Sequence, residues 1–200
     1  VPWHFLRERQ GAVIKWAPID DDGNFLIDEF EKLLTPRTKM VAITQMSNAL
    51  GTYVPVKEVV RIAHARGIPV LVDGSQAAVH MPIDVQDIDA DFYVFTGHKL
   101  YGPKGCGALY IRKSMKLDPL IIGGGQERGM RSGTLNVPGI VGLGRACAIC
   151  AAEMAAEGTR RMLVNGAYWC LGLDEQIPAE GTSVDLVGEY KPTMYGFGGF

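Results

Sequence analysis

An acid and a lysine follow two short apolar segments of this 200-residue chain, and the two side chains could do chemistry together. Asp73 follows residues 70–72, and Lys99 comes shortly after residues 92–95. Pyridoxal 5'-phosphate needs such a pair, because its aldehyde forms a Schiff base with a lysine and its pyridine nitrogen stays protonated beside a carboxylate. Taken singly, the acid would be a turn residue and the lysine a solvated amine. Their joint placement favours a cofactor site.

The two apolar segments have the pattern of strands buried in a parallel sheet. Each is too short for a helix, rich in β-branched or aromatic residues, and continuous rather than alternating. Neighbouring strands lie roughly 4.8 Å apart. Open α/β sheets bind ligands at the carboxyl ends of their strands. If the two strands are neighbours, the acid and the lysine meet at that edge.

The rest of the chain predicts strands alternating with helices. Further strands are expected at residues 13–17, 40–44 and 107–111. Helices are expected over residues 28–34 and 55–67 and from about Pro138, and Asp28 is expected to cap the first of them with Glu31 as capping-box partner. This order makes parallel crossover units. The predicted fold class is therefore α/β, a three-layer sandwich with a mostly parallel sheet.

The composition is that of a soluble globular protein. Its 47% apolar residues can bury a full core. Twenty Lys and Arg residues stand against 22 Asp and Glu residues, which gives no reason to expect nucleic acid or membrane as a partner. There is no apolar run long enough to span a bilayer and no signal-peptide pattern, so a cytoplasmic location is predicted.

The four cysteines predict neither a disulfide framework nor a metal site. Cys147 and Cys150 form a C-x-x-C, but they share one helical face with Leu143 and Met154. We interpret this face as a core stripe. Burial raises the pKa of a thiol, so both cysteines are expected to be inert. A second pair that could complete a structural zinc site is absent from the sequence.

One long pattern resembles a known family. Residues 72–77, Val-Asp-Gly-Ser-Gln-Ala, and residues 91–105, Asp-Phe-Tyr-Val-Phe-Thr-Gly-His-Lys-Leu-Tyr-Gly-Pro-Lys-Gly, are similar to the cysteine desulfurases, which are class V members of the fold type I pyridoxal phosphate enzymes. The resemblance runs from Val1 to about Met154. It implies conversion of L-cysteine to L-alanine, with the sulfur passing to an enzyme cysteine as a persulfide for iron–sulfur cluster or other sulfur-cofactor assembly.

The resemblance also implies the residues of the site. Lys99 and Asp73 would be catalytic and would bind the cofactor. Gln76 would donate to the ring hydroxyl oxygen, and Thr96 and His98 would hydrogen-bond the phosphate.

Two more cofactor contacts are implied outside this stretch. Asn48 would contact the cofactor and the substrate carboxylate. Thr134 lies in the glycine-rich residues 121–136 and would reach the phosphate of a neighbouring subunit, so a homodimer is expected. A sulfur-acceptor or scaffold protein would be a further partner.

Residues 1–157 are expected to form the cofactor-binding large domain without its N-terminal part. Residues 158–200 are either the start of the small C-terminal domain or an irregular tail. The chain is therefore expected to be a fragment, incomplete at both ends. None of its cysteines has the sequence context of the family's persulfide-forming nucleophile.

Several alternatives stay open. Residues 92–103 look like the type II desulfurases and residues 123–135 like type I. A selenocysteine lyase, another class V pyridoxal phosphate enzyme, or a catalytically incomplete fragment would share the same pattern. A nicotinamide dehydrogenase or a nucleotide phosphotransferase is disfavoured, because the glycine motif of each is missing.

Overall fold

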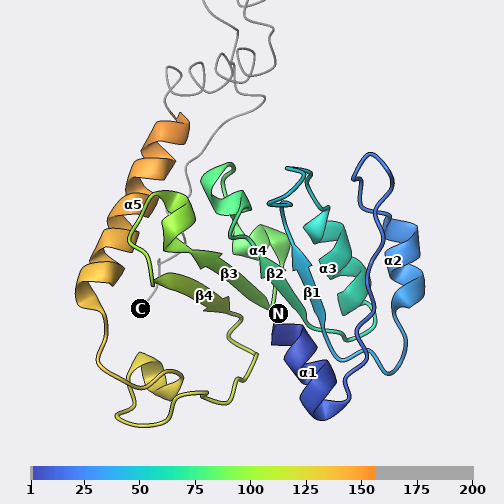
Figure 1. Cartoon of the computed structure of the whole chain (residues 1–200), viewed down its shortest axis with the longest axis horizontal. Coiled ribbons are helices and arrows are strands. Elements are labelled where there is room, and N and C mark those ends of the chain that lie inside the picture. Colours follow the sequence, from blue (N-terminus) through green and yellow to red (C-terminus); the bar gives the residue numbers. More distant parts are fainter. Residues whose placement is uncertain (1, 156–200) are drawn as a thin grey trace, which may run out of the picture.

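The computed structural model describes residues 2–155, and these build a four-stranded sheet (Figure 1). The strands are β1 Val41–Thr44, β2 Val70–Asp73, β3 Phe92–Thr96 and β4 Gly107–Ile111, in the order β1-β2-β3-β4. The first three run parallel, and β4 runs antiparallel to β3. The predicted mostly parallel α/β sheet is confirmed, and so is the strand expected at residues 107–111.

Helices connect and flank these strands. They are α1 Pro2–Gln10, α2 Ile27–Leu33, α3 Val56–His64, α4 Val85–Ile88 and α5 Val137–Ala155. Three short 3-10 helices are η1 Ala77–Val79, η2 Gly97–Leu100 and η3 Glu127–Gly129. In Figure 1, α2 and α3 lie on the β1 side of the sheet and α5 lies on the β3–β4 side. The helix expected over residues 55–67 is confirmed as α3.

The core is built on one face of the sheet. Register pairs Val41 with Val70, so these side chains share a face with Val72 two residues on. Val70, Val72 and Val59 of α3 are all 0% exposed. Burying one such side chain stabilises the fold by roughly 1.5–3 kcal/mol. The other face is less completely covered, since Leu109 of β4 is 46% exposed.

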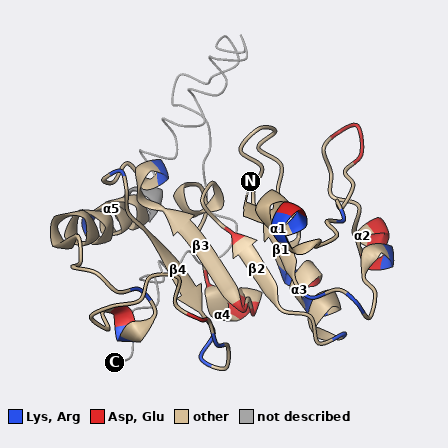
Figure 2. Cartoon of the chain, turned by 60° about the horizontal axis from the view of Figure 1, so that its bottom comes forward, with Lys and Arg blue, Asp and Glu red and all other residues tan. Residues whose placement is uncertain are grey.

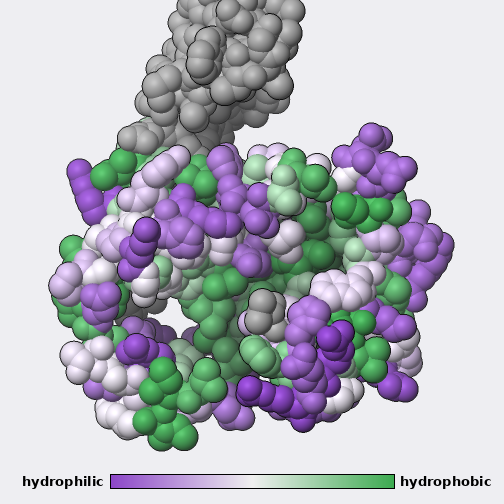
Figure 3. Space-filling view, viewed as in Figure 1, coloured by the Kyte–Doolittle hydropathy of each residue, from purple (hydrophilic) through white to green (hydrophobic). Residues whose placement is uncertain are grey.

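Apolar side chains also gather on the loop that follows β4. Leu120 is 97% exposed and Ile122 is 85% exposed. Figure 3 shows this loop as a green cluster at the lower left of the molecule. Lys and Arg, by contrast, are spread over separate elements in the view of Figure 2. Within residues 2–155, no helix combines the length and the hydropathy that a membrane span requires.

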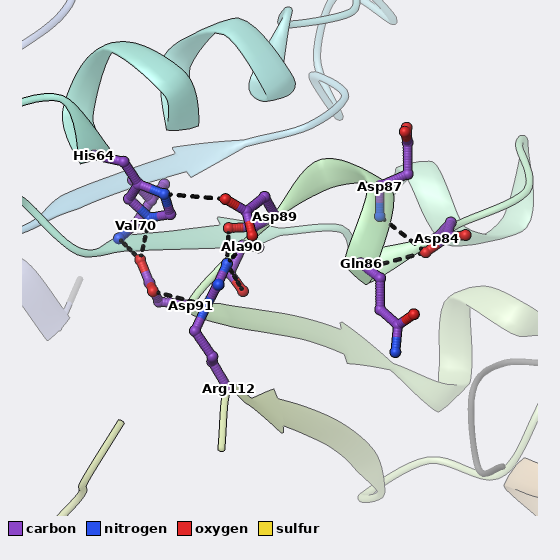
Figure 4. A network of polar contacts seen from close by, with 9 residues as sticks. All are labelled: His64, Val70, Asp84, Gln86, Asp87, Asp89, Ala90, Asp91 and Arg112. Carbon is purple, nitrogen blue, oxygen red and sulfur yellow. Dashed lines mark hydrogen bonds and ion pairs between the residues drawn. The ribbon is translucent and has the colours of Figure 1, made fainter. Parts of the chain in front are cut away.

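A buried carboxylate joins four elements at the amino end of β3 (Figure 4). Asp91 is 5% exposed, and its Oδ2 lies 2.8 Å from both the Val70 backbone nitrogen and His64 Nε2. Arg112 Nε lies 3.1 Å from Asp91 Oδ1, as an ion pair without hydrogen-bond geometry. The guanidinium of Arg112 also donates to Asp89 and holds the pKa of that carboxyl below its usual value. The network ties α3, β2 and β4 to the start of β3.

Two local predictions are wrong. Residues 13–17 form no strand, and Val13 and Trp16 are 69% and 66% exposed. A strand needs a neighbour for its backbone hydrogen bonds, and in the described sheet β1 pairs with β2 alone. Asp28 does not cap α2, because the helix begins at Ile27 with Leu26 as its N-cap. Asp28 lies instead in the first turn, where a negative charge favours the helix dipole.

The core stripe of α5 is confirmed where its side chains are described. Leu143 and Cys150 are buried, and Cys147 is half-buried. The side chain of Met154 and the region 158–200 lie outside the described residues.

Candidate active site

The structure brings Asp73 and Lys99 to one edge of the sheet. β2 ends at Asp73, which is the register partner of Val94 on β3. Lys99 follows two residues after Gly97 in η2, the short helix that begins directly after β3. Because β2 and β3 are parallel neighbours, both residues lie at their carboxyl edge. The red tip of β2 marks this edge in Figure 2.

The Asp73 carboxylate keeps one oxygen available for a ligand. Its Oδ1 accepts a hydrogen bond of 2.9 Å from the Ser75 backbone nitrogen. Its Oδ2 has no hydrogen-bond donor among the described residues. The backbone is fixed as well, since the carbonyl of Asp73 accepts from the Gln45 nitrogen at 2.9 Å. The acid is thus held by its backbone and one oxygen, while the other can accept from a ring N–H.

The Lys99 amine is half-buried, and within residues 2–155 it makes neither an ion pair nor a hydrogen bond. A carboxylate partner would occupy such an amine in an ion pair. An amine without that partner suits covalent attachment to an aldehyde. The groups at this edge, one amine just after β3 and one carboxylate at the end of β2 with a free oxygen, therefore fit pyridoxal 5'-phosphate.

Three further predicted contacts lie near this pair, and each has a partner within the chain. Thr96 Oγ1 and His98 Nδ1 lie 2.9 Å apart, so the two expected phosphate contacts bond to each other. Gln76 immediately precedes η1, and its Nε2 lies 2.9 Å from His80 Nε2. The Gln76 amide keeps its oxygen and a second N–H for a ligand.

The remaining two predicted residues lie apart from each other. Asn48 is exposed in the turn that follows β1, at the same sheet edge as Asp73. Thr134 is exposed in the loop between β4 and α5. Because β4 runs antiparallel, this loop starts from the opposite edge, and Figure 1 shows it in yellow at the bottom. Within one chain the structure does not bring Thr134 to Lys99.

One buried hydrogen bond next to the turn after Asp73 could not be predicted from the spacing of the motifs. The Tyr93 hydroxyl donates to Gln45 Oε1 over 2.6 Å, and the two residues are 2% and 6% exposed. A Cβ on Gly74 would lie 1.8 Å from that hydroxyl oxygen. Residue 74 must therefore be glycine, and Tyr93 supports the turn that carries Asp73. The only sequence signal was the Asp-Gly pair, which also fits an ordinary turn.

The described cysteines are poor nucleophiles in this structure. Burial raises the pKa of the Cys147 thiol, and the neighbouring Cys150 adds to the effect. Cys150 is buried and donates to the Leu100 carbonyl. Cys106 is half-buried, and its Sγ donates to the Pro103 carbonyl at 3.2 Å. The predicted burial of the C-x-x-C pair is confirmed, with Cys147 only partly covered.

We expect Cys147 to be alkylated slowly by iodoacetamide in the folded protein at pH 7.5, because the reactive thiolate is scarce when the pKa is raised. Peptide mass spectrometry of timed samples measures the rate. Labelling should accelerate when pH rises or when the protein is unfolded in urea. Native labelling as fast as in urea would contradict this expectation, and Cys147→Ser provides the blank.

The comparisons with known proteins agree with this geometry. Residues 1–165 match the family described as aminotransferase class-V. The chain belongs to this class-V family. Among curated relatives, a probable cysteine desulfurase of Mycolicibacterium paratuberculosis is 46% identical over 73% of this chain and 24% of its own length. Cysteine desulfurase IscS of Methanosarcina thermophila is 44% identical over 78% of this chain and 38% of its own length. The class-V chain thus spans less than half of these relatives.

Solved structures give the same result for the fold. A NifS-like protein is 38% identical, with a TM-score of 0.75 over 82% of this chain and 45% of its own. SspA in complex with cysteine is also 38% identical, with a TM-score of 0.70 over 74% of this chain and 43% of its own. The class-V chain therefore has the predicted fold type I architecture over the part that it covers, and the resemblance to cysteine desulfurases is confirmed.

Proposed function

We propose that this class-V protein is a pyridoxal 5'-phosphate-dependent cysteine desulfurase, which takes sulfur from L-cysteine and releases L-alanine. The observation that carries the proposal is the pairing of Asp73 and Lys99 at one edge of parallel strands. The names of the curated relatives support the reaction. The cysteine bound to SspA, a protein of the same fold, supports the substrate.

The cofactor, when bound, withdraws electrons from the substrate α-carbon. Lys99 Nζ would hold it covalently and would move the α-proton. The free Oδ2 of Asp73 would accept from the ring N–H and favour its protonated state. Thr96 and His98 would bind the phosphate, since both already lie at the end of β3.

Two amide side chains would orient the cofactor ring and the substrate. Gln76 would donate to the ring hydroxyl oxygen from its place before η1, and Asn48 would contact the substrate carboxylate from the turn after β1. None of the described cysteines is assigned to sulfur acceptance, because Cys147 has a raised pKa, Cys150 is buried, and the half-buried Cys106 donates to the Pro103 carbonyl. A persulfide-forming residue would have to come from outside residues 2–155.

The site would be completed by a second copy of the protein. Thr134 lies in a loop at the opposite sheet edge from Lys99 of its own chain, which suits a contact with a neighbour's phosphate. The same loop exposes Leu120, Ile121 and Ile122 (Figure 3). Large apolar exposure of this kind marks protein interaction surfaces. We infer a homodimer and a separate sulfur-acceptor or scaffold protein in iron–sulfur assembly; cytoplasmic location stays a prediction.

The test is to locate the cofactor. We expect borohydride reduction of the cofactor-loaded protein, followed by peptide mapping, to place the pyridoxyl group on Lys99. Lys104 lies five residues further and is exposed, so Lys104→Ala is the matched control and should keep the label. Lys99→Ala should lose it. A label on another lysine in the unchanged protein would reject the assignment.

A further inference from the structure

The long helix α5 packs against the turn that carries Lys99. Cys150 Sγ donates to the Leu100 carbonyl at 3.6 Å. A Cβ on Gly102 would lie 3.1 Å from the Ala146 Cβ, so the turn comes close to the helix there as well. Figure 1 shows α5 running beside the segment between β3 and β4. Helix α5 therefore supports one side of the turn formed by residues 97–103.

Gly142 makes the tightest of these approaches. A Cβ on Gly142 would lie 2.6 Å from Pro103 Cγ and 3.2 Å from Pro103 Cδ. Carbon atoms in favourable contact lie about 3.5–4.0 Å apart. The proline ring is closed onto its own backbone and cannot swing aside. The helix can lie this close to Pro103 only because residue 142 has no side chain.

Pro103, which contacts Gly142, also lies close to the start of η2. The Pro103 carbonyl oxygen would lie 3.1 Å from a Cβ on Gly97, the first residue of η2. Gly97 also accepts from the Gly102 nitrogen at 2.9 Å and donates to the Cys106 carbonyl at 2.9 Å. A displacement of Pro103 therefore moves Gly97, and Lys99 follows two residues later.

The turn has room to move if this contact changes. A cavity of about 310 Å³ lies beside it, lined by residues of the turn and of α5 that include Tyr101, Arg145 and Ile149. Arg145 and Ile149 are both exposed at the rim. No described side chain fills this space, so on this side the turn rests on α5 through the contacts of Cys150, Ala146 and Gly142, of which that of Gly142 with Pro103 is the tightest.

We propose that Gly142 is a positioning residue for Lys99, acting through Pro103 and Gly97. The inference rests on the proposed function, because it takes Lys99 as the lysine that holds the cofactor. A methyl group at residue 142 would push Pro103 by about 1 Å to reach normal contact distance. Misplacement of a reacting group by about 1 Å can lower turnover by about a hundredfold.

The test compares Gly142→Ala with Gly144→Ala. Both glycines lie in α5, so both substitutions favour the helix equally. Among residues 2–155, a Cβ on Gly144 meets no atom within 4 Å. We expect Gly142→Ala to bind the cofactor on Lys99 but to shift the pH titration of the cofactor's absorbance by about 0.5 unit, a threefold change in the protonation equilibrium. Turnover of L-cysteine should fall at least about tenfold. Gly144→Ala should match the unchanged protein in both measurements.

Pro103→Ala, alone and combined with Gly142→Ala, completes a double-mutant comparison. It removes Cγ and Cδ, while Pro103 Cβ lies 4.0 Å from the added methyl and stays in ordinary contact. The double variant should therefore behave like Pro103→Ala alone. If Gly142→Ala does not fold, Pro103→Ala decides the matter, because loss of the ring should also shift the titration. An unchanged titration in Pro103→Ala, or equal behaviour of the two glycine variants, would overturn the inference.

Failure of the proposed function gives a different result. In that case the unchanged protein and Gly144→Ala would show no cofactor on Lys99 in the borohydride experiment. Cofactor on Lys99 in both, with no difference in Gly142→Ala, would leave the function intact and reject only the positioning role.

Discussion

Asp73→Asn is expected to slow exchange of the substrate α-proton by about a hundredfold or more, while the cofactor stays attached to Lys99. Removing an adjacent negative charge lowers the pKa of a protonated ring nitrogen by about one to three units. A fall of about two units reduces the protonated fraction about a hundredfold, and the ring withdraws electrons less effectively without that proton. Proton exchange of L-cysteine in deuterium oxide, followed by NMR, measures the effect.

The substitution leaves the turn in place. Asn keeps an oxygen that can accept from the Ser75 nitrogen, as Asp73 Oδ1 does now. Asp87→Asn is the matched control, because Asp87 is an exposed acid on α4 that pairs with Lys57. The control should exchange at the normal rate. Equal exchange in Asp73→Asn and the unchanged protein would show that Asp73 has no electronic role.

Gly74→Ala is expected to destabilise the protein severely. The new methyl carbon would overlap the Tyr93 ring, whose Cζ and Cε1 lie 2.0 and 2.4 Å from its position. Tyr93 is 2% exposed and bonded to Gln45, so the ring cannot move without breaking a buried hydrogen bond. Overpacking costs about 1–3 kcal/mol and an unsatisfied buried partner about 1–3 kcal/mol more. The sum is a large share of a typical stability of about 5–15 kcal/mol.

Urea unfolding followed by circular dichroism gives the stability. Gly144→Ala is again the control, because it adds the same methyl where no atom of the described residues lies within 4 Å. Tyr93→Phe should not rescue Gly74→Ala, since phenylalanine keeps the ring carbons that overlap the methyl. A stability within about 1 kcal/mol of the control would show that the turn relaxes without loss.

The sheet edge was predictable because each strand of the site is short, apolar and followed by polar residues. Residues 70–72 and 92–95 are apolar runs too short to form a helix. Their length and their β-branched and aromatic content therefore predicted β2 and β3. Asp73 and Lys99 were placed by the ends of those strands. The expected strand at residues 13–17 failed because an apolar run becomes a strand only where a neighbour pairs with it.

Contacts between residues distant in sequence could not be predicted in the same way. Tyr93 belongs to an apolar run, and nothing in that run shows that its hydroxyl reaches Gln45 or fills the space above Gly74. The glycines of α5 look alike in the sequence. Only packing distinguishes Gly142, where a Cβ would meet Pro103, from Gly144, where it would meet no atom within 4 Å in the described part of the chain.

The buried carboxylate of Asp91 also acts on conformations that the chain must avoid. Asp91 accepts from the Val70 nitrogen and pairs with His64 and Arg112, and these contacts exist in one alignment of β2 with β3. A slip of one residue would turn the side chains of β3 to the other face of the sheet. It would also carry a charged group away from its three partners, and an unpaired buried charge is strongly destabilising. Asp91 thereby makes misaligned pairings of β2 with β3 less stable than the one alignment that builds the site at the opposite edge.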